Sequence, residues 1–233
     1  MRRFWTEATA VQADGGWRVL LDGRPIRTQM GAPQVVPKRA LAEALAAEWA
    51  AQGEEIDPTG FPLRDMADYA IDMVAADRAG IAEKLLGFVE TDTLCYRADP
   101  DEPLWKRQQA VWEPVVSAFE AREGVRLERV SGVLHRPQPE ETLATLRTRL
   151  EGLDPFTLAA LEATTSLAAS LVIGLAALEP GSDADALWDA AELEESWQAD
   201  LWGRDDEAEA RRAKRRDDFR RAVAFARVAG PRP

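Results

Sequence analysis

The sequence predicts an α+β protein, with a small N-terminal antiparallel β-sheet domain that includes one helix, followed by a larger all-helical domain. Three observations support this prediction. Short segments separated by Asp-Gly turns occupy residues 4–28, helical periodicity runs from residue 63 almost to the end, and 46% of the 233 residues are hydrophobic, as in an ordinary globular protein. We therefore expect a β-rich domain at residues 1–58 and a helical domain at residues 59–233.

Three strands are expected in the first domain, at residues 4–11, 17–21 and 24–28. The turns that separate them contain Asp14-Gly15-Gly16 and Asp22-Gly23. Glycine supplies the positive φ that a tight hairpin turn requires. A three-stranded meander is the simplest structure that this order of segments can form.

Helices account for most of the remaining chain. The first is predicted to begin at Pro37 and to end at Gly53, because proline is favoured at helix starts and glycine at helix ends. Trp49 is expected to anchor this helix on the sheet. Later helices are expected at residues 63–74, from 103 with a kink or restart at Pro114, at 139–150, 156–178 and 182–203, and from 205 onward. A short extended piece near residues 125–133 is expected to return to the sheet or to pair locally.

The charge balance restricts the class of partner. The net charge is −12, from 41 acidic and 29 basic residues, and both nucleic acids and anionic membranes require a positive surface. Residues 211–216 are rich in arginine, but acids are interleaved with them at helical spacing, which favours a self-neutralising solvated face. Residues 156–178 contain one charge, Glu162, and acids flank them, so we expect a buried helix rather than a membrane span.

Cysteine content and the N-terminus indicate the compartment. Cys95 is the only cysteine, which excludes an internal disulfide and favours a reducing environment. The first residues carry charges without an apolar run behind them, so secretion is not expected. The bacterial cytoplasm is the predicted location.

Candidates for catalysis are few. His135 is the only histidine and has no nucleophile motif near it, so a catalytic triad is not supported. Cys95 lies in an apolar stretch that is typical of an inert buried thiol. No glycine-rich phosphate loop is present. A catalytic triad, a reactive thiol and a nucleotide-binding loop are therefore not indicated by the sequence.

Three aspartates support the main alternative function. Asp65, Asp68 and Asp72 are spaced three and four residues apart, so they share one face of a helix. Such a face can hold a magnesium ion through water, as in a Mg-dependent hydrolase or lyase, or it can be an ordinary solvated face.

A carboxylate interrupts the apolar stripe of the predicted 182–203 helix. Glu194 falls between Ala191 and Trp197, where the periodicity requires an apolar residue. A carboxylate there must be paired, half exposed at a cleft or used by a partner, and a buried pair with an arginine of the last helix is the structural alternative. Candidate partner-binding residues gather around it, several of them acidic or aromatic: Glu194, Glu195, Trp197, Gln198, Trp202 and Gly203.

Short motifs follow one another in a specific order along nearly the whole sequence. They are Arg3-Phe4, Leu21-Asp22-Gly23-Arg24-Pro25 with Thr28, Glu48-Trp49-x-x-Gln52 with Ile56 and Pro58, Pro62-Leu63, Ala70-Ile71-Asp72, Thr91-Asp92-x-Leu94-x-Tyr96-Arg97, Gln109 with Trp112-x-Pro114, Ser170-Leu171, and Leu193-Glu194-x-x-x-Gln198-x-x-x-Trp202-Gly203. In this order and spacing they resemble a known family, the chaperones that hold the alpha subunit of the ATP synthase F(1) sector before it joins beta. Gln29, Arg64 and Tyr69 depart from the family pattern.

The resemblance implies a two-domain molecular chaperone without catalytic activity, cofactor or metal. Its client is expected to be the unassembled alpha subunit, whose aggregation it prevents until beta displaces it. Glu194 is similar in position to the family's functionally important glutamate. The resemblance also implies a monomer when free, with eukaryotic relatives in the mitochondrial matrix.

Overall fold

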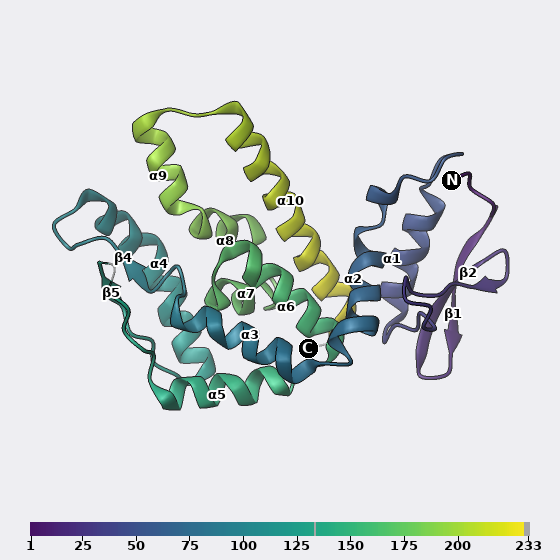
Figure 1. Ribbon diagram of the computed structural model, residues 1–233, viewed down its shortest axis with the longest axis horizontal. Helices are drawn as coiled ribbons and strands as arrows, with labels where there is room; N and C mark the ends of the chain where they lie inside the picture. The colour runs from purple at the N-terminus through teal and green to yellow at the C-terminus, as the bar shows by residue number, and fades with distance from the viewer. Residues whose placement is uncertain (133, 231–233) are drawn as a thin grey trace. The chain divides into compact units, whose positions relative to one another are not determined.

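The computed structural model describes residues 1–132 and 134–230, and these form two compact units. The first unit contains Met1–Arg78 together with residues 154–160 and 224–230, and the second contains Ala79–Leu153 and Leu161–Val223. Figure 1 shows a small sheet near the N-terminus and helices through the rest of the chain. This content confirms the predicted α+β class.

The sheet of the first unit is an antiparallel meander. Its strands are β1 (Ala8–Ala13), β2 (Gly16–Leu21) and β3 (Arg24–Pro25), paired in that order. The predicted Asp-Gly turns lie between them. At the second turn Asp22 adopts a φ of 46°, a conformation that aspartate tolerates better than most residues. Its carboxylate accepts hydrogen bonds from the backbone nitrogens of Thr6 and Glu7, at 3.0 and 2.8 Å.

Helix α1 (Arg39–Ala50) packs on β1 and β2 through Leu41 and Leu45, which are fully buried. Trp49 was predicted to anchor the helix on the sheet, and the aromatic rings that it contacts lie outside the three strands. Its ring packs edge-on against Trp5, with centroids 5.0 Å apart, and against Phe61 at 4.6 Å. The ring therefore fills the space between the N-terminal segment and the loop before the next helix.

The first unit extends beyond the boundary expected at residue 58. A short 3-10 turn (Pro58–Gly60) leads into α2 (Pro62–Tyr69), which continues as a π-helical turn (Ala70–Val74). The Glu48 carboxylate of α1 accepts hydrogen bonds from the backbone nitrogens of Leu63 and Arg64, at 2.7 and 2.9 Å. These donors have no partner within their own helix, so the capping attaches α2 to α1.

The second unit is helical apart from one short parallel ladder. β4 (Tyr96–Arg97) pairs with β5 (Val130–Ser131) in a separate two-stranded sheet. The predicted extended piece therefore neither joins the N-terminal sheet nor pairs with its sequence neighbours; residue 133 lies outside the described residues. Its helices are α3 (Arg78–Glu90), α4 (Pro103–Glu123), α5 (Glu140–Glu151), α6 (Pro155–Ala168), α7 (Leu171–Ala177), α8 (Ala184–Ala191), α9 (Leu193–Trp202) and α10 (Asp206–Ala229). Pro114 lies inside α4, which runs through it without the predicted restart.

Two predicted helices are each broken into two. The 156–178 segment divides at Ala169, whose φ is 49°, and the Ser170 hydroxyl accepts a hydrogen bond from Ile173 at the start of α7. The 182–203 segment divides at Glu192. Asp183 accepts the capping hydrogen bonds of α8, from the backbone nitrogens of Asp185 and Ala186.

Helices α6 and α10 contribute residues to both units. In the first unit, Phe156 of α6 and Phe225 of α10 stack with ring centroids 6.5 Å apart. In the second unit, Glu162 of α6 is buried and accepts a hydrogen bond from Lys84 at 2.7 Å. No helix in the described part of the chain is long and apolar enough to cross a bilayer.

Candidate partner-binding site

The predicted partner-binding residues lie on α9 or directly after it. This helix is loosely packed, because Leu193 is its only buried residue in the described structure. Near its C-terminal end Leu201 is 61% exposed and Trp202 is 85% exposed. Together they form a small exposed apolar patch, and such patches can mark sites of contact with another protein.

Glu194 lies on the side of α9 that faces α4. Its carboxylate accepts a hydrogen bond of 2.6 Å from the side-chain nitrogen of Gln108. Burial raises the pKa of Glu194 above its usual value, the Gln108 hydrogen bond opposes this shift, and the neighbouring Glu195 charge adds to it. The apolar stripe from which Glu194 was identified does not exist as predicted, because the helix breaks at Glu192.

Gln108 of α4, the partner of Glu194, was not among the residues predicted from the sequence. It is completely buried in α4, and its oxygen accepts a hydrogen bond from the backbone nitrogen of Ala98 at 2.9 Å. One turn later, the Trp112 indole donates to the carbonyl of Ala190 at the end of α8, at 2.7 Å. The sequence signal that could have indicated Gln108 is its spacing from Trp112, because residues four positions apart lie on one face of a helix.

Trp197 also faces α4. The guanidinium of Arg107 lies 5.7 Å from the centre of its ring, a distance at which a cation is attracted to an aromatic face. The same Arg107 forms an ion pair of 3.5 Å with Asp200. Glu194, Trp197 and Asp200 therefore attach α9 to α4.

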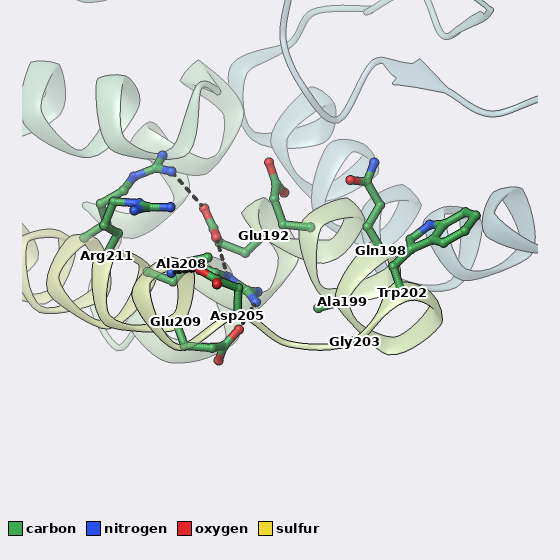
Figure 2. A pocket seen from close by; sticks show the side chains of 12 residues that line it. Glu192, Gln198, Ala199, Trp202, Gly203, Asp205, Ala208, Glu209 and Arg211 are labelled. Carbon is green, nitrogen blue, oxygen red and sulfur yellow. Dashed lines mark hydrogen bonds and ion pairs between the residues drawn. The ribbon is translucent and has the colours of Figure 1, made fainter.

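The opposite side of α9 borders a cavity of about 490 Å³ between α9 and the start of α10. Of the predicted residues, Glu195, Gln198, Trp202 and Gly203 line it, whereas Glu194 and Trp197 do not. Figure 2 shows Gln198 and Trp202 projecting from the same side of α9. The predicted set thus divides into an α4-facing row and a cavity-facing row.

Glu192 connects the cavity wall to α10. It is 4% exposed, and its carboxylate forms ion pairs with Arg212 at 3.1 Å and Arg215 at 3.5 Å. Arg212 also donates to the Ser196 hydroxyl at 2.7 Å. The sequence suggested a buried ion pair between Glu194 and an arginine of the last helix. The structure has such a pair at Glu192. Because a buried carboxylate needs such partners, Glu192 determines how α9 and α10 approach one another.

The three aspartates of α2 and its π-turn have hydrogen-bonding partners in the loop after β3. Asp68 is buried and accepts from the Gln34 side chain at 2.5 Å and from the Gln29 backbone at 3.1 Å. Asp72 accepts from the Thr28 hydroxyl at 2.7 Å. Within residues 1–132 and 134–230, no three His, Cys, Asp or Glu side chains are grouped so as to hold a metal ion. These carboxylates hold the loop against the helix.

The other candidates for chemistry have structural surroundings. His135 is exposed, and its Nδ1 lies 3.0 Å from the Tyr96 hydroxyl. Cys95 is buried, and burial raises the pKa of its thiol far above the usual range. The basic run of α10 is neutralised as expected, with Arg211 paired to Glu207 at 2.6 Å and Arg216 to Asp185 at 2.8 Å.

Comparisons with known proteins agree with this structure. The family model described as ATP12 chaperone protein matches residues 2–120. The Schizosaccharomyces pombe protein named "Protein atp12, mitochondrial" is 26% identical over 214 residues, which cover 87% of this chain and 74% of that protein. The crystal structure of Atp12 from Paracoccus denitrificans is 38% identical, covers 98% of both chains and has a TM-score of 0.94. The crystal structure of the Atu1473 protein from Agrobacterium tumefaciens is 40% identical, covers 97% of this chain and 85% of that one, and has a TM-score of 0.92.

Proposed function

The chain belongs to the ATP12 chaperone family, and from this premise we propose that its client is the unassembled alpha subunit of the ATP synthase F(1) sector. The protein binds this subunit, prevents its aggregation and releases it when beta arrives. It carries out no catalytic step and uses no cofactor, and it acts as a monomer in the bacterial cytoplasm. The family membership confirms that the chain is a chaperone; the identity of the client is the proposal.

One observation supports the proposal more than any other, namely the exposed acidic and aromatic surface of α9. Trp202 and Leu201 are exposed beside Glu195 and Gln198. Interfaces between proteins concentrate their binding energy in residues such as tryptophan, surrounded by polar groups. A loosely packed helix that presents such residues is suited to holding another polypeptide.

The proposed mechanism requires only mass action. An alpha subunit without beta exposes a surface that aggregates, and binding to the chaperone lowers its free concentration. Beta forms a larger interface with the same subunit and displaces the chaperone. No covalent bond is formed or broken in the cycle, so nucleotide hydrolysis is not needed.

Charge reversal at Glu194 tests the proposal. In cells that produce the alpha subunit together with the chaperone, wild-type protein is expected to keep the subunit soluble, and Glu194→Lys is expected to abolish this effect while the melting temperature stays within a few degrees. Glu7→Lys is the matched control, because Glu7 is exposed on the first unit and undergoes the same charge change.

A second variant separates binding from folding. Glu194→Gln removes the charge and retains an oxygen that can accept the Gln108 hydrogen bond. Weaker solubilisation by this variant at unchanged stability assigns the charge to client binding. Loss of the native fold in Glu194→Lys, with normal activity of Glu194→Gln, makes Glu194 a structural residue only. An alpha subunit that is equally soluble with and without the wild-type chaperone refutes the proposed function.

A further inference from the structure

The cavity between α9 and α10 has an apolar floor and an exposed aromatic edge. Ala199 of α9 and Ala208 of α10 both line it, and so does Trp202, which has 85% of its surface exposed. Its volume of about 490 Å³ lies within the range of roughly 300–1,000 Å³ that is usual for binding pockets. The space is sufficient for a large apolar side chain and part of the backbone that carries it.

The arginines at this cavity are already neutralised. Arg211 pairs with Glu207, and Arg212 pairs with Glu192 and Glu209. Arg215 pairs with Glu192 and also donates to the carbonyl of Leu167 at 2.6 Å. These cations therefore contribute little net attraction for an anionic ligand.

Two of the three acids on α9 are not neutralised in the same way, whereas Asp200 pairs with Arg107 and Arg204. Over the residues that the structure describes, Glu195 has no cationic side chain within ion-pair distance, and the partner of Glu194 is the neutral amide of Gln108. Burial and the adjacent Glu195 charge raise the pKa of Glu194, as expected for two acids that lack a counter-charge. Of these two acids only Glu195 lines the cavity, so it places an unpaired negative charge there that favours a cation.

From this geometry we infer that the cavity binds a client segment in which a large apolar side chain is adjacent to a lysine or arginine. The apolar side chain fills the space between Ala199 and Ala208 and lies against the Trp202 ring. The neighbouring cation pairs with Glu195. This inference rests on the proposed function, because it specifies the chemistry that the chaperone recognises in its client.

Filling the cavity and reversing its rim charge test the inference in the full-length protein. Ala199→Phe occupies the floor, and Ala210→Phe is its control, because Ala210 is exposed on α10 outside the cavity. Glu195→Lys reverses the rim charge, and Glu7→Lys is its control. Each variant is produced together with the alpha subunit, and the soluble alpha subunit that copurifies is measured. We expect at least about a tenfold weaker complex for the two cavity variants, as for other interface hot spots, and wild-type behaviour for the controls.

Overlapping peptides that span the alpha subunit provide the second measurement. Peptides captured by the wild-type protein are expected to contain the apolar–basic pair, and replacing either residue of the pair weakens their binding. A peptide in which the basic residue is changed to glutamate should bind Glu195→Lys better than it binds the wild-type protein, because this exchange restores opposite charges.

The outcomes distinguish the proposed client from the proposed binding cavity. If the wild-type protein does not solubilise the alpha subunit, the proposed function is wrong. If the wild-type protein does so and both cavity variants match it, the client is correct and the cavity is not its binding site. If Ala199→Phe fails to fold, Trp202→Ala replaces it, since a side chain this exposed contributes little to folding; wild-type binding by Trp202→Ala and Glu195→Lys then overturns the inference.

Discussion

Replacing Gln108 with leucine tests how α9 is held in place. Leucine is close to glutamine in size, so the change leaves no large cavity, but it removes both hydrogen bonds of the buried amide. The backbone nitrogen of Ala98 loses its acceptor at 2.9 Å, and Glu194 loses its donor at 2.6 Å. Leaving a buried donor unsatisfied costs about 1–3 kcal/mol. Ala98 is half-buried and Glu194 can be rehydrated, so we expect a loss of about 1–2 kcal/mol.

Urea and thermal unfolding measure this loss. For a chain of this size, about 1–2 kcal/mol corresponds to a fall in melting temperature of about 2–8 °C. The matched control is Gln109→Leu, at the next position of the same helix, where the structure shows no side-chain hydrogen bond among the described residues. The pKa of Glu194 should also rise further, because the Gln108 hydrogen bond normally lowers it. A Gln108→Leu protein that unfolds together with wild type and keeps the wild-type Glu194 titration refutes the proposed link between α4 and α9.

Three further outcomes follow from other buried acids. Glu192→Gln should lower the unfolding free energy by about 1–3 kcal/mol in urea titrations, less than the removal of a fully buried ion pair, because its two arginine partners are 25% and 46% exposed. Burial raises the pKa of Asp92 from 3.8 to about 6, so the folded state holds this proton more tightly than the unfolded state and loses stability as the pH rises through that window. The stability of wild type relative to Asp92→Asn should therefore fall by about 3 kcal/mol from well below pH 3.8 to well above pH 6, and a constant difference would contradict the assignment. Asp68→Ala should destabilise the first unit by about 1–3 kcal/mol by leaving the Gln34 and Gln29 donors unsatisfied, and millimolar magnesium should leave the wild-type melting curve unchanged, whereas a shift to higher temperature would restore the metal hypothesis.

The elements that the sequence predicts correctly are those with local causes. The β-meander follows from Asp-Gly turns, whose backbone conformation is a property of two adjacent residues. The shared face of Asp65, Asp68 and Asp72 follows from helical spacing. What these aspartates bind could not be predicted in the same way, because their donors lie in a loop more than thirty residues earlier.

The helix break at Ala169 shows why the remainder was missed. Alanine is the strongest helix former, and the only local signal of an interruption is the capping residue Ser170 that follows it. The cause is distant in sequence: Asp92 is fully buried and accepts a hydrogen bond from the backbone nitrogen of Val172 at 3.1 Å. The Asp92 carboxylate therefore caps α7 from the segment that follows α3. A cap supplied by a residue so distant in sequence cannot be predicted from hydrophobic periodicity.

The candidate site was predicted only in part, for the same reason. Its residues were identified because acids and tryptophans cluster near Glu194. These residues divide between the α4-facing side and the cavity-facing side of α9. That division depends on the helix break at Glu192 and on the ion pair of Glu192 with Arg212, twenty residues later. The cavity arises from that pairing, so it could be found only once the helices were placed in space.

The division of α10 between the two units affects the order in which the protein can be made. A ribosome releases a chain from its N-terminal end, yet Phe225 stacks on Phe156 within the unit that also contains the N-terminal sheet. The meander can form early in translation, whereas the packing around it stays incomplete until the last helix has emerged. A copy that lacks residues 224–230 therefore keeps the residues of the acidic α9 surface but cannot form the Phe156–Phe225 stack of the first unit.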